Sequence, residues 1–221
     1  MKLYSYFRSS AAYRVRIALQ IKGLAHDYVP IHLLRQEHTG AAYAAVAPTR
    51  LVPTLEVDGD HLAQSMAIIE YLDETHPAPA LLPSDPWARA QVRALAQSIA
   101  CEIHPLNNLG VLTYLVQELK LDEAAKQGWI EHWVRTGLER FERQLDALAV
   151  RREAAGLPPS VYCHGDTPTL ADCCLVPQIF NAQRFKVDLT GLPRTVAAYE
   201  ACVQLGSFQR AHPSQCPDGV A

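Results

Sequence analysis

Apolar side chains in the first thirty residues alternate between the spacing of a strand and that of a helix. Short apolar and aromatic runs at about 2–7 and 26–31 predict two strands. Between them, over about 12–22, apolar positions recur every three or four residues, which predicts a helix that ends at Gly23. The chain therefore begins with a predicted βαβ unit.

The pattern continues with a hairpin and a second helix. Apolar runs at 51–57 and 61–63 flank an Asp58-Gly59 pair, and such a pair between two runs is typical of a tight hairpin turn. A helix with apolar residues on one face is predicted from Gln64-Ser65 to just before Pro77. A loop with a short helical stretch joins the two halves, and the resulting order, βαβ, link, ββα, resembles a thioredoxin-like domain.

A proline-rich linker at 76–87 separates this part from a chain that is helical almost to its end. The apolar spacing predicts helices from Trp87 to about Leu119, from Asp122 to about Val150, and from Thr169 onward. We therefore expect an α/β thioredoxin-like domain at 1–80 and an all-α domain at 88–221. The last residues, 212–219, have no helical pattern, and we expect a mobile end or a flap near the cleft.

The helix that begins at Thr169 has a clear local start signal. Thr169 as N-cap, with Asp172 three residues later, forms a variant of the capping box before a very apolar helix. Losing such a cap typically costs about 1 kcal/mol, so we interpret both residues as structural rather than catalytic.

The composition is that of a folded globular chain. Of its 221 residues, 49% are hydrophobic, and 20 basic residues are mixed with 23 acidic ones to give a net charge of -3. No basic stripe could hold a nucleic-acid backbone, and no run of about 18 apolar residues could span a membrane. Arg8, Arg14 and Arg16 interrupt the first apolar run before it could form a signal peptide. We expect no nucleic-acid or membrane partner and a cytoplasmic location.

The cysteines and histidines show no metal-binding or disulfide pattern. The six cysteines contain no CxxC pair, which is typical of thiols in a reducing compartment. The nine histidines form no HxxxH or HExxH motif. We therefore expect no metal site.

The stretch from Arg8 to Leu19 brings two serines to the point where the first strand turns into the first helix. The first turn of a helix has unpaired N–H groups and the positive end of the helix dipole, which stabilise an anion or a thiolate. A hydroxyl that donates to the sulfur adds to this stabilisation. The alternative is that Ser9 or Ser10 is simply an N-cap.

Val52-Pro53 opens the predicted third strand, as in thioredoxin-like domains. Proline has no N–H for the sheet, so the residue before it can keep its N–H and C=O for a peptide ligand, particularly if the bond is cis. The alternative is an ordinary proline at the edge of a sheet.

Several motifs together resemble a cytosolic glutathione transferase over the whole chain, and most closely the zeta class, which includes maleylacetoacetate and maleylpyruvate isomerases. They are Arg8-Ser9-Ser10 with Tyr13-Arg14-Val15-Arg16-Ile17-Ala18-Leu19, Leu51-Val52-Pro53-Thr54-Leu55, Gln64 to Leu72, His104-Pro105-Leu106-Asn107-Asn108-Leu109, Gly165 to Asp172, and Arg184 to Leu189.

The resemblance implies that glutathione is the cofactor and that the protein is a homodimer. Val52 would pair with the cysteinyl unit of glutathione, and Gln64 with Ser65 would hold the γ-glutamyl carboxylate. Ser9 is the first candidate for activating the thiol, and Ser10 the second. The implied glutathione-binding residues are Ser9, Ser10, Ala11, Ala12, Tyr13, Arg14, His38, Val52, Pro53, Gln64, Ser65, His104, Asn108, Leu109 and Gly110. Without the resemblance, His38 and His104 read as ordinary surface or packing histidines.

The chain departs from the family pattern at two positions. The class usually has Ser-Ser-Cys where this chain has Ser9-Ser10-Ala11, so no protein thiol is expected to take part. Gly110 lies in a turn that is arginine-rich in some relatives, the maleylpyruvate isomerases. Arg8 and Arg184 are the candidates for binding a dicarboxylic acid substrate. With fewer cations, the site favours maleylacetoacetate or a neutral electrophile over maleylpyruvate.

The implied reaction is a glutathione-dependent cis–trans isomerisation of an unsaturated diacid to its fumaryl product, in the breakdown of aromatic compounds. Two alternatives use the same fold. One is a general transferase that conjugates or dehalogenates small electrophiles, and the other is a non-catalytic module that binds a partner protein.

Overall fold

The computed structural model describes residues 1–219 and divides the chain into two compact units. The first unit consists of Met1–Leu81 together with the segment that begins at Val203, and the second is Leu82–Cys202. This division differs from the expected all-α domain at 88–221, because the segment from Val203 belongs to the first unit. The cause is a set of long-range contacts between the last helix and the first, which local sequence patterns do not encode.

The first unit contains a four-stranded mixed sheet in the order β2-β1-β3-β4. Its strands are β1 (Lys2–Ser5), β2 (Asp27–Pro30), β3 (Thr54–Val57) and β4 (Asp60–Ala63). β1 runs parallel to β2 and antiparallel to β3, with Leu3 opposite both Tyr28 and Leu55. The predicted βαβ and ββα halves are therefore confirmed. Asp58 and Gly59 both have positive φ, at 51° and 93°, as the predicted hairpin turn requires.

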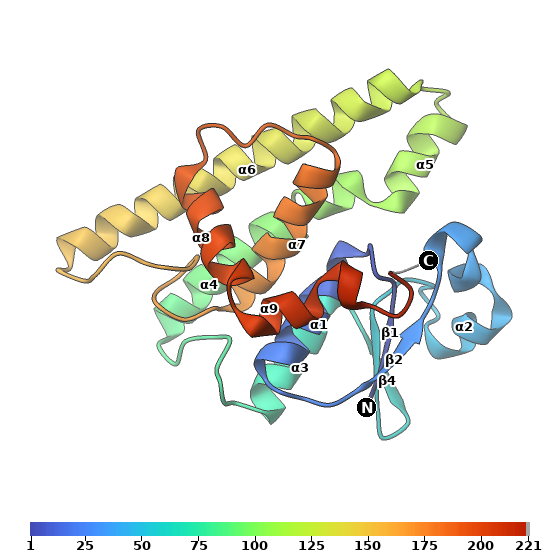
Figure 1. The fold of residues 1–221 in the computed structure, drawn as a ribbon, viewed down its shortest axis with the longest axis horizontal. Coiled ribbons are helices and arrows are strands. Elements are labelled where there is room, and N and C mark those ends of the chain that lie inside the picture. The colour runs from blue at the N-terminus through green and yellow to red at the C-terminus, as the bar shows by residue number, and fades with distance from the viewer. Residues whose placement is uncertain (220–221) are drawn as a thin grey trace. The chain divides into compact units, whose positions relative to one another are not determined.

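The helices of the first unit cover this sheet and meet each other through buried apolar side chains. They are α1 (Ser10–Ile21), α2 (Ala41–Val46), α3 (Ser65–Thr75) and α9 (Gly206–Ala211), with short 3-10 turns η1 (Leu33–Arg35), η2 (Glu37–Thr39) and η4 (Pro213–Gln215). Leu19, Ile68 and Leu72 are fully buried. α1 packs against both α3 and α9, and Figure 1 shows α9 lying beside α1.

The second unit is helical, as predicted. Its elements are α4 (Pro86–Ala100), η3 (His104–Asn107), α5 (Leu109–Gln117), α6 (Glu123–Ala154), α7 (Leu170–Arg184) and α8 (Pro193–Val203). The central α7 is buried along most of its length and packs against α4, which also packs against α6. The single helix predicted from Trp87 to about Leu119 is wrong, because Pro105 lies in a 3-10 turn and Asn108 starts a new helix.

The start of α7 confirms the capping box. The backbone N–H of Thr169 donates to Asp172 Oδ2 at 2.8 Å, and the Thr169 hydroxyl caps the first turn. Asp172 is fully buried and also accepts the backbone N–H of Cys163 at 2.9 Å. Both residues thus hold the polypeptide in place, which is the structural role that the sequence indicates.

Among residues 1–219, no helix is long and apolar enough to cross a membrane. The same residues contain no group of three or more His, Cys, Asp or Glu side chains arranged to hold a metal ion.

Candidate functional site

Ser9 lies at the turn from β1 into α1, where its backbone is extended and its side chain caps the helix. Its Oγ accepts the backbone N–H of Ala12 at 3.2 Å, and its own N–H donates to the carbonyl of Tyr6 at 2.9 Å. A hydroxyl that accepts a hydrogen bond can still donate its own proton. The N-cap interpretation is therefore confirmed, and the hydroxyl proton of Ser9 can still be directed to an anion.

The next residues of α1 differ in exposure and partners. Ser10 is the first helical residue and is buried, whereas Ala11 is partly exposed. Tyr13 is buried, and its ring meets that of His212 edge to face at 6.2 Å between centroids. Arg8 is exposed, with its guanidinium carbon 4.9 Å from the centre of the Phe7 ring. Of these side chains, Arg8 is the one that presents charge to solvent beside Ser9.

The Val52–Pro53 peptide bond is cis. Pairing between β1 and β3 begins at Thr54, so Val52 lies outside the ladder. The preceding carbonyl, that of Leu51, accepts the hydroxyl of Tyr43 at 2.7 Å. Val52 therefore keeps its backbone N–H and C=O outside the sheet, as the sequence argument for a peptide ligand requires.

The start of α3 lacks the side-chain cap found on other long helices. α1, α4, α5, α6 and α7 each begin with a side chain that accepts a backbone N–H, but Gln64, which precedes α3, makes no such bond. Gln64 also has a positive φ of 73°, which a side-chain-bearing residue rarely adopts. An uncapped helix start is suited to an external anion, which would take the place of the cap.

Behind this helix start lies a buried arginine. Arg14 is 2% exposed, and its Nη1 donates to Ser65 Oγ at 3.2 Å. Its Nε and Nη2 are also buried and have no hydrogen-bond partner in the described chain. Unpaired donors of a buried cation are costly, so their presence next to an uncapped helix points to an anionic ligand.

His38 lies in η2, where its Nδ1 is buried and without a partner among the described residues. Its neighbours on both sides are exposed, so the ring is held at the surface of the first unit. This arrangement fits either a ligand contact or the packing histidine that the residue alone suggests.

The remaining predicted site residues lie in the second unit. His104 begins η3, and Asn108 caps α5 by accepting the N–H of Val111 at 3.2 Å. Leu109 and Gly110 are the first two residues of α5. Arg184 lies in the last turn of α7 with its guanidinium carbon 4.6 Å from the centre of the Phe185 ring. Asn108 is therefore the N-cap of α5, a structural role that the sequence analysis did not predict.

Two residues near Ser9 were missed by the sequence analysis. Arg16 is buried and donates to the carbonyls of Tyr6 and Phe7, and Asp218 accepts the N–H of Phe7. The one available signal was an arginine inside an otherwise apolar helix, which has to find buried acceptors. Asp218 gave no signal, because its partners are about 190 and 211 residues away in sequence.

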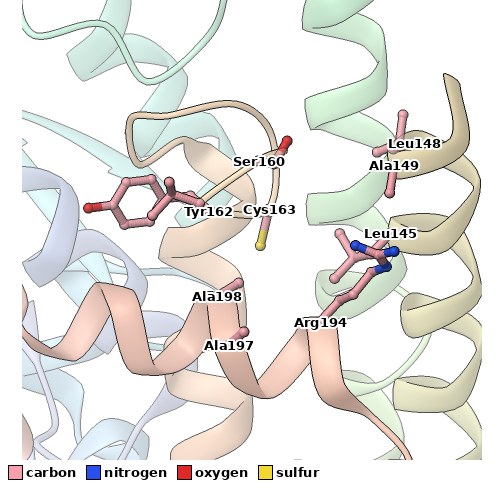
Figure 2. A pocket seen from close by; sticks show the side chains of 10 residues that line it. Leu145, Leu148, Ala149, Ser160, Tyr162, Cys163, Arg194, Ala197 and Ala198 are labelled. Carbon is pink, nitrogen blue, oxygen red and sulfur yellow. The ribbon is translucent and has the colours of Figure 1, made fainter. Parts of the chain in front are cut away.

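A separate small pocket of about 100 Å³ lies in the second unit (Figure 2). Ser160 and Cys163 come from the loop before α7, Leu145 from α6, and Arg194 from α8. Burial raises the pKa of the Cys163 thiol well above its usual range. This pocket contains none of the predicted site residues, and its cysteine is poorly suited to act as a nucleophile.

Comparisons with known proteins agree with both units. Family models described as the N-terminal and C-terminal domains of glutathione S-transferase match residues 8–75 and 127–202. A maleylacetoacetate isomerase of Rhizobium meliloti is 46% identical over 213 residues, with 96% of each chain covered.

Solved structures with the same fold are also similar in sequence. One is the holo structure of a maleylpyruvate isomerase, described as a bacterial glutathione S-transferase in the zeta class, with a TM-score of 0.91, 45% identity and 99% of each chain covered. Another is a maleylacetoacetate isomerase from Anaeromyxobacter dehalogenans with dicarboxyethyl glutathione and citrate in its active site. It has a TM-score of 0.83 and 43% identity, over 99% of this chain and 93% of that one.

Proposed function

The chain belongs to the zeta class of the glutathione transferase family, and from this membership we propose that it is a glutathione-dependent isomerase of maleylacetoacetate or maleylpyruvate. The observation that carries the proposal is Ser9, whose hydroxyl caps α1 and still has a proton to donate beside the positive end of that helix. A serine so placed lowers the pKa of a thiol bound next to it.

The residues of the first unit fit glutathione. The uncapped start of α3 and the two Arg14 nitrogens without a partner in the described chain would bind the γ-glutamyl carboxylate. Ser65 Oγ accepts a hydrogen bond from Arg14, so its O–H points away from Arg14. We infer that this O–H donates a hydrogen bond to the γ-glutamyl carboxylate. The backbone of Val52 would hold the cysteinyl unit through paired main-chain hydrogen bonds.

When bound, glutathione supplies a thiolate whose reversible addition to an activated cis double bond allows the former double bond to rotate before elimination. Ser9 keeps the sulfur in its charged form by donating a hydrogen bond to it from the hydroxyl. Negative charge that develops on the substrate carbonyl needs cationic or N–H donors, and Arg8 is an exposed candidate at the same turn. Arg184 is the proposed second cation for the carboxylates of the substrate.

Charge does not choose between the two diacids. Gly110, at the start of α5, adds no charge to the candidate site. Maleylacetoacetate and maleylpyruvate both carry two carboxylates, so a missing cation weakens the binding of either one, and we propose both as candidate substrates. The thioether named in the related structure, dicarboxyethyl glutathione, is the type of adduct that a thiol forms with an unsaturated four-carbon diacid.

The test is a direct assay of both diacids, with and without glutathione, with the fumaryl product quantified. For the parent protein we expect turnover that needs glutathione and consumes none. Ser9→Ala should lower kcat/KM by about 100-fold, because it removes the hydroxyl that stabilises the thiolate. Ser9→Thr keeps both the cap and the hydroxyl and should retain most of the activity.

Other outcomes would change the proposal. Glutathione adducts that accumulate on halogenated acids, without isomerisation, would instead indicate a conjugating or dehalogenating transferase. Failure of the parent protein to bind to immobilised glutathione would indicate a non-catalytic module. Loss of the Ser9 cap alone costs about 1 kcal/mol of stability, so unfolding midpoints must show that Ser9→Ala remains folded under the assay conditions.

We also propose a homodimer in the cytoplasm. Trp87, in the first turn of α4, is 67% exposed, which is unusual for a residue of this size and is typical of a protein interface. None of the six cysteines forms a disulfide, as expected in a reducing compartment. Light scattering should give twice the chain mass of 24.4 kDa, and Trp87→Asp should shift the protein toward one chain mass.

A further inference from the structure

The segment that begins at Val203 belongs to the first unit, and its Asp218 bonds to Phe7, two residues before Ser9. The backbone N–H of Phe7 donates to Asp218 Oδ2 at 3.1 Å, and the hydroxyl of Tyr28 donates to Asp218 Oδ1 at 2.6 Å. One carboxylate therefore joins the C-terminal segment to β2 and to the turn that carries Ser9.

Arg16 holds the same turn from the other side. It is 4% exposed, and its guanidinium donates to the Phe7 carbonyl at 3.1 Å, to the Tyr6 carbonyl at 3.4 Å and to the Ala211 carbonyl at 3.1 Å. The Tyr6 carbonyl also accepts the N–H of Ser9. The peptide group between Tyr6 and Phe7 is thus held by Asp218 and Arg16. The carbonyl of the next peptide group, that of Phe7, is held by Arg16.

The C-terminal segment is itself folded into a compact turn that orients Asp218. The N–H of Cys216 donates to the Pro213 carbonyl at 3.2 Å, and the N–H of Gly219 donates to the Cys216 carbonyl at 2.9 Å. A Cβ at Gly219 would collide with the Pro213 carbonyl oxygen, so this position needs glycine. The segment that the sequence suggested to be a mobile end or a flap is therefore anchored through residue 219.

Both contacts of Asp218 need a hydrogen-bond acceptor at this position. A carboxylate can accept both hydrogen bonds, one on each oxygen. An asparagine side chain at this position would instead point its NH2 group, a donor, at one of the two donors. Burial, together with the hydrogen bond to Asp218, raises the pKa of Tyr28, so its phenol remains a donor at neutral pH. Buried Arg16 provides positive charge at the same turn.

We propose that the C-terminal segment is a positioning element of the thiol site, in which Asp218, with Arg16, fixes the backbone that sets the direction of the Ser9 hydroxyl. The inference rests on the proposed glutathione-dependent function. The hydrogen bonds of Asp218 go to Phe7 and Tyr28, before Ser9 and on β2, so it should affect the activation of the thiol more than the binding of glutathione. A small displacement of a catalytic hydroxyl is enough to lower a rate by one or two orders of magnitude.

The experiment compares Asp218→Asn and Gly219→Ala with the parent protein and with Ser214→Ala. Ser214 is a control in the same segment, because its side chain bonds to His212 and does not touch Phe7. For both test variants we expect kcat to fall about tenfold, the dissociation constant of glutathione to stay within about threefold, and the pKa of bound glutathione thiol to rise. The thiol pKa is read from the ultraviolet absorbance of the thiolate during a pH titration, which does not depend on isomerisation.

Hydrogen exchange of the backbone amides in residues 6–12 supplies a second measurement, without glutathione. Exchange should accelerate in Asp218→Asn and Gly219→Ala and stay at the parent rate in Ser214→Ala. An unchanged thiol pKa and unchanged exchange in both test variants would overturn the proposal, as would glutathione binding weakened by much more than threefold with the pKa of the bound thiol unchanged. A parent protein that binds glutathione but does not isomerise diacids would refute the proposed substrate alone, and a parent that does not bind glutathione would refute both.

Discussion

Two arginines on the same helix, two residues apart, are both buried but differ in their partners. Arg16 donates to carbonyl and hydroxyl oxygens of the first unit. Arg14 donates to Ser65, and its other two nitrogens have no partner among residues 1–219. A buried charge whose partners are incomplete destabilises the protein by itself, and it is tolerated where a ligand completes it. The contrast suggests that Arg16 serves the fold and Arg14 serves the ligand.

Arg14→Met should therefore have opposite effects on stability and on binding. Removing an incompletely paired buried charge should raise the free energy of unfolding of the ligand-free protein, by about 1 kcal/mol. The same change should weaken glutathione binding by about 10- to 100-fold, because a charge-assisted hydrogen bond contributes about 1.5–3 kcal/mol. Denaturant unfolding and titration calorimetry measure the two quantities.

Arg16→Met is the matched control for this prediction. It leaves several backbone carbonyls without their donor, so it should lower the free energy of unfolding rather than raise it. If Arg14→Met destabilised the ligand-free protein as well, the buried charge would be structural, and the proposed carboxylate site behind α3 would lose its main support.

At the scale of elements, sequence periodicity located most helices and strands, and it failed where a break depended on a few residues. The apolar positions from Val92 to Leu106 recur without interruption, yet the helix ends at Ala100 and a 3-10 turn follows. Pro105 was a visible signal for this break, but proline is also tolerated in the first turn of a helix. Its effect could not be decided without knowing which contacts surround it.

One such contact involves a glycine in the middle of α6. A Cβ built on Gly137 would lie 2.7 Å from Cδ1 of Ile103, which is fully buried at the break between α4 and η3. The absence of a side chain at position 137 thus allows the two elements to approach closely. Helix propensity alone would favour almost any other residue there.

Gly137→Ala should destabilise the protein, while Gly128→Ala in the same helix should stabilise it. A Cβ at Gly128 meets no atom within 4 Å, so this change contributes up to about 1 kcal/mol of helix propensity. At Gly137 the same gain is opposed by an overpacking cost of about 1–3 kcal/mol. Denaturant midpoints of the two variants should move in opposite directions, and a shift of both toward higher stability would contradict the close approach of Ile103.

For the whole molecule, the sequence predicted the two-part architecture and the family, because both depend on local order and on motifs. Ser9, Val52 and Gln64 could be located in the same way, since each stands at a recognisable start of a strand or helix. The return of the C-terminal segment to the first unit could not be predicted. It depends on the hydrogen bonds of Arg16 to the Ala211 carbonyl and of the Phe7 N–H to Asp218, whose partners lie 195 and 211 residues apart.

Each unit contains a histidine whose pKa is lowered by burial. Burial lowers the pKa of His164 in the second unit, with a further effect from the charge of Arg152. Burial also lowers the pKa of His212 in the first unit, and the charge of Arg16 acts in the same direction. In the unfolded chain both groups titrate near pH 6.5. Between that value and the lower folded values, the unfolded chain binds more protons than the native one.

Stability should therefore fall as the pH is lowered from about 7 through 6.5 toward 5, because the free energy of unfolding increases with pH wherever the unfolded state holds more protons. The lowered pKa values of Glu56 and Asp188 act in the same direction, but at more acidic pH. Replacing His164 and His212 together with Gln should flatten the slope of the unfolding free energy between pH 5 and 7, and leave the slope above pH 7.5 as in the parent. A double variant with the parent's slope near pH 6 would show that these two histidines are not the groups whose protonation destabilises the fold.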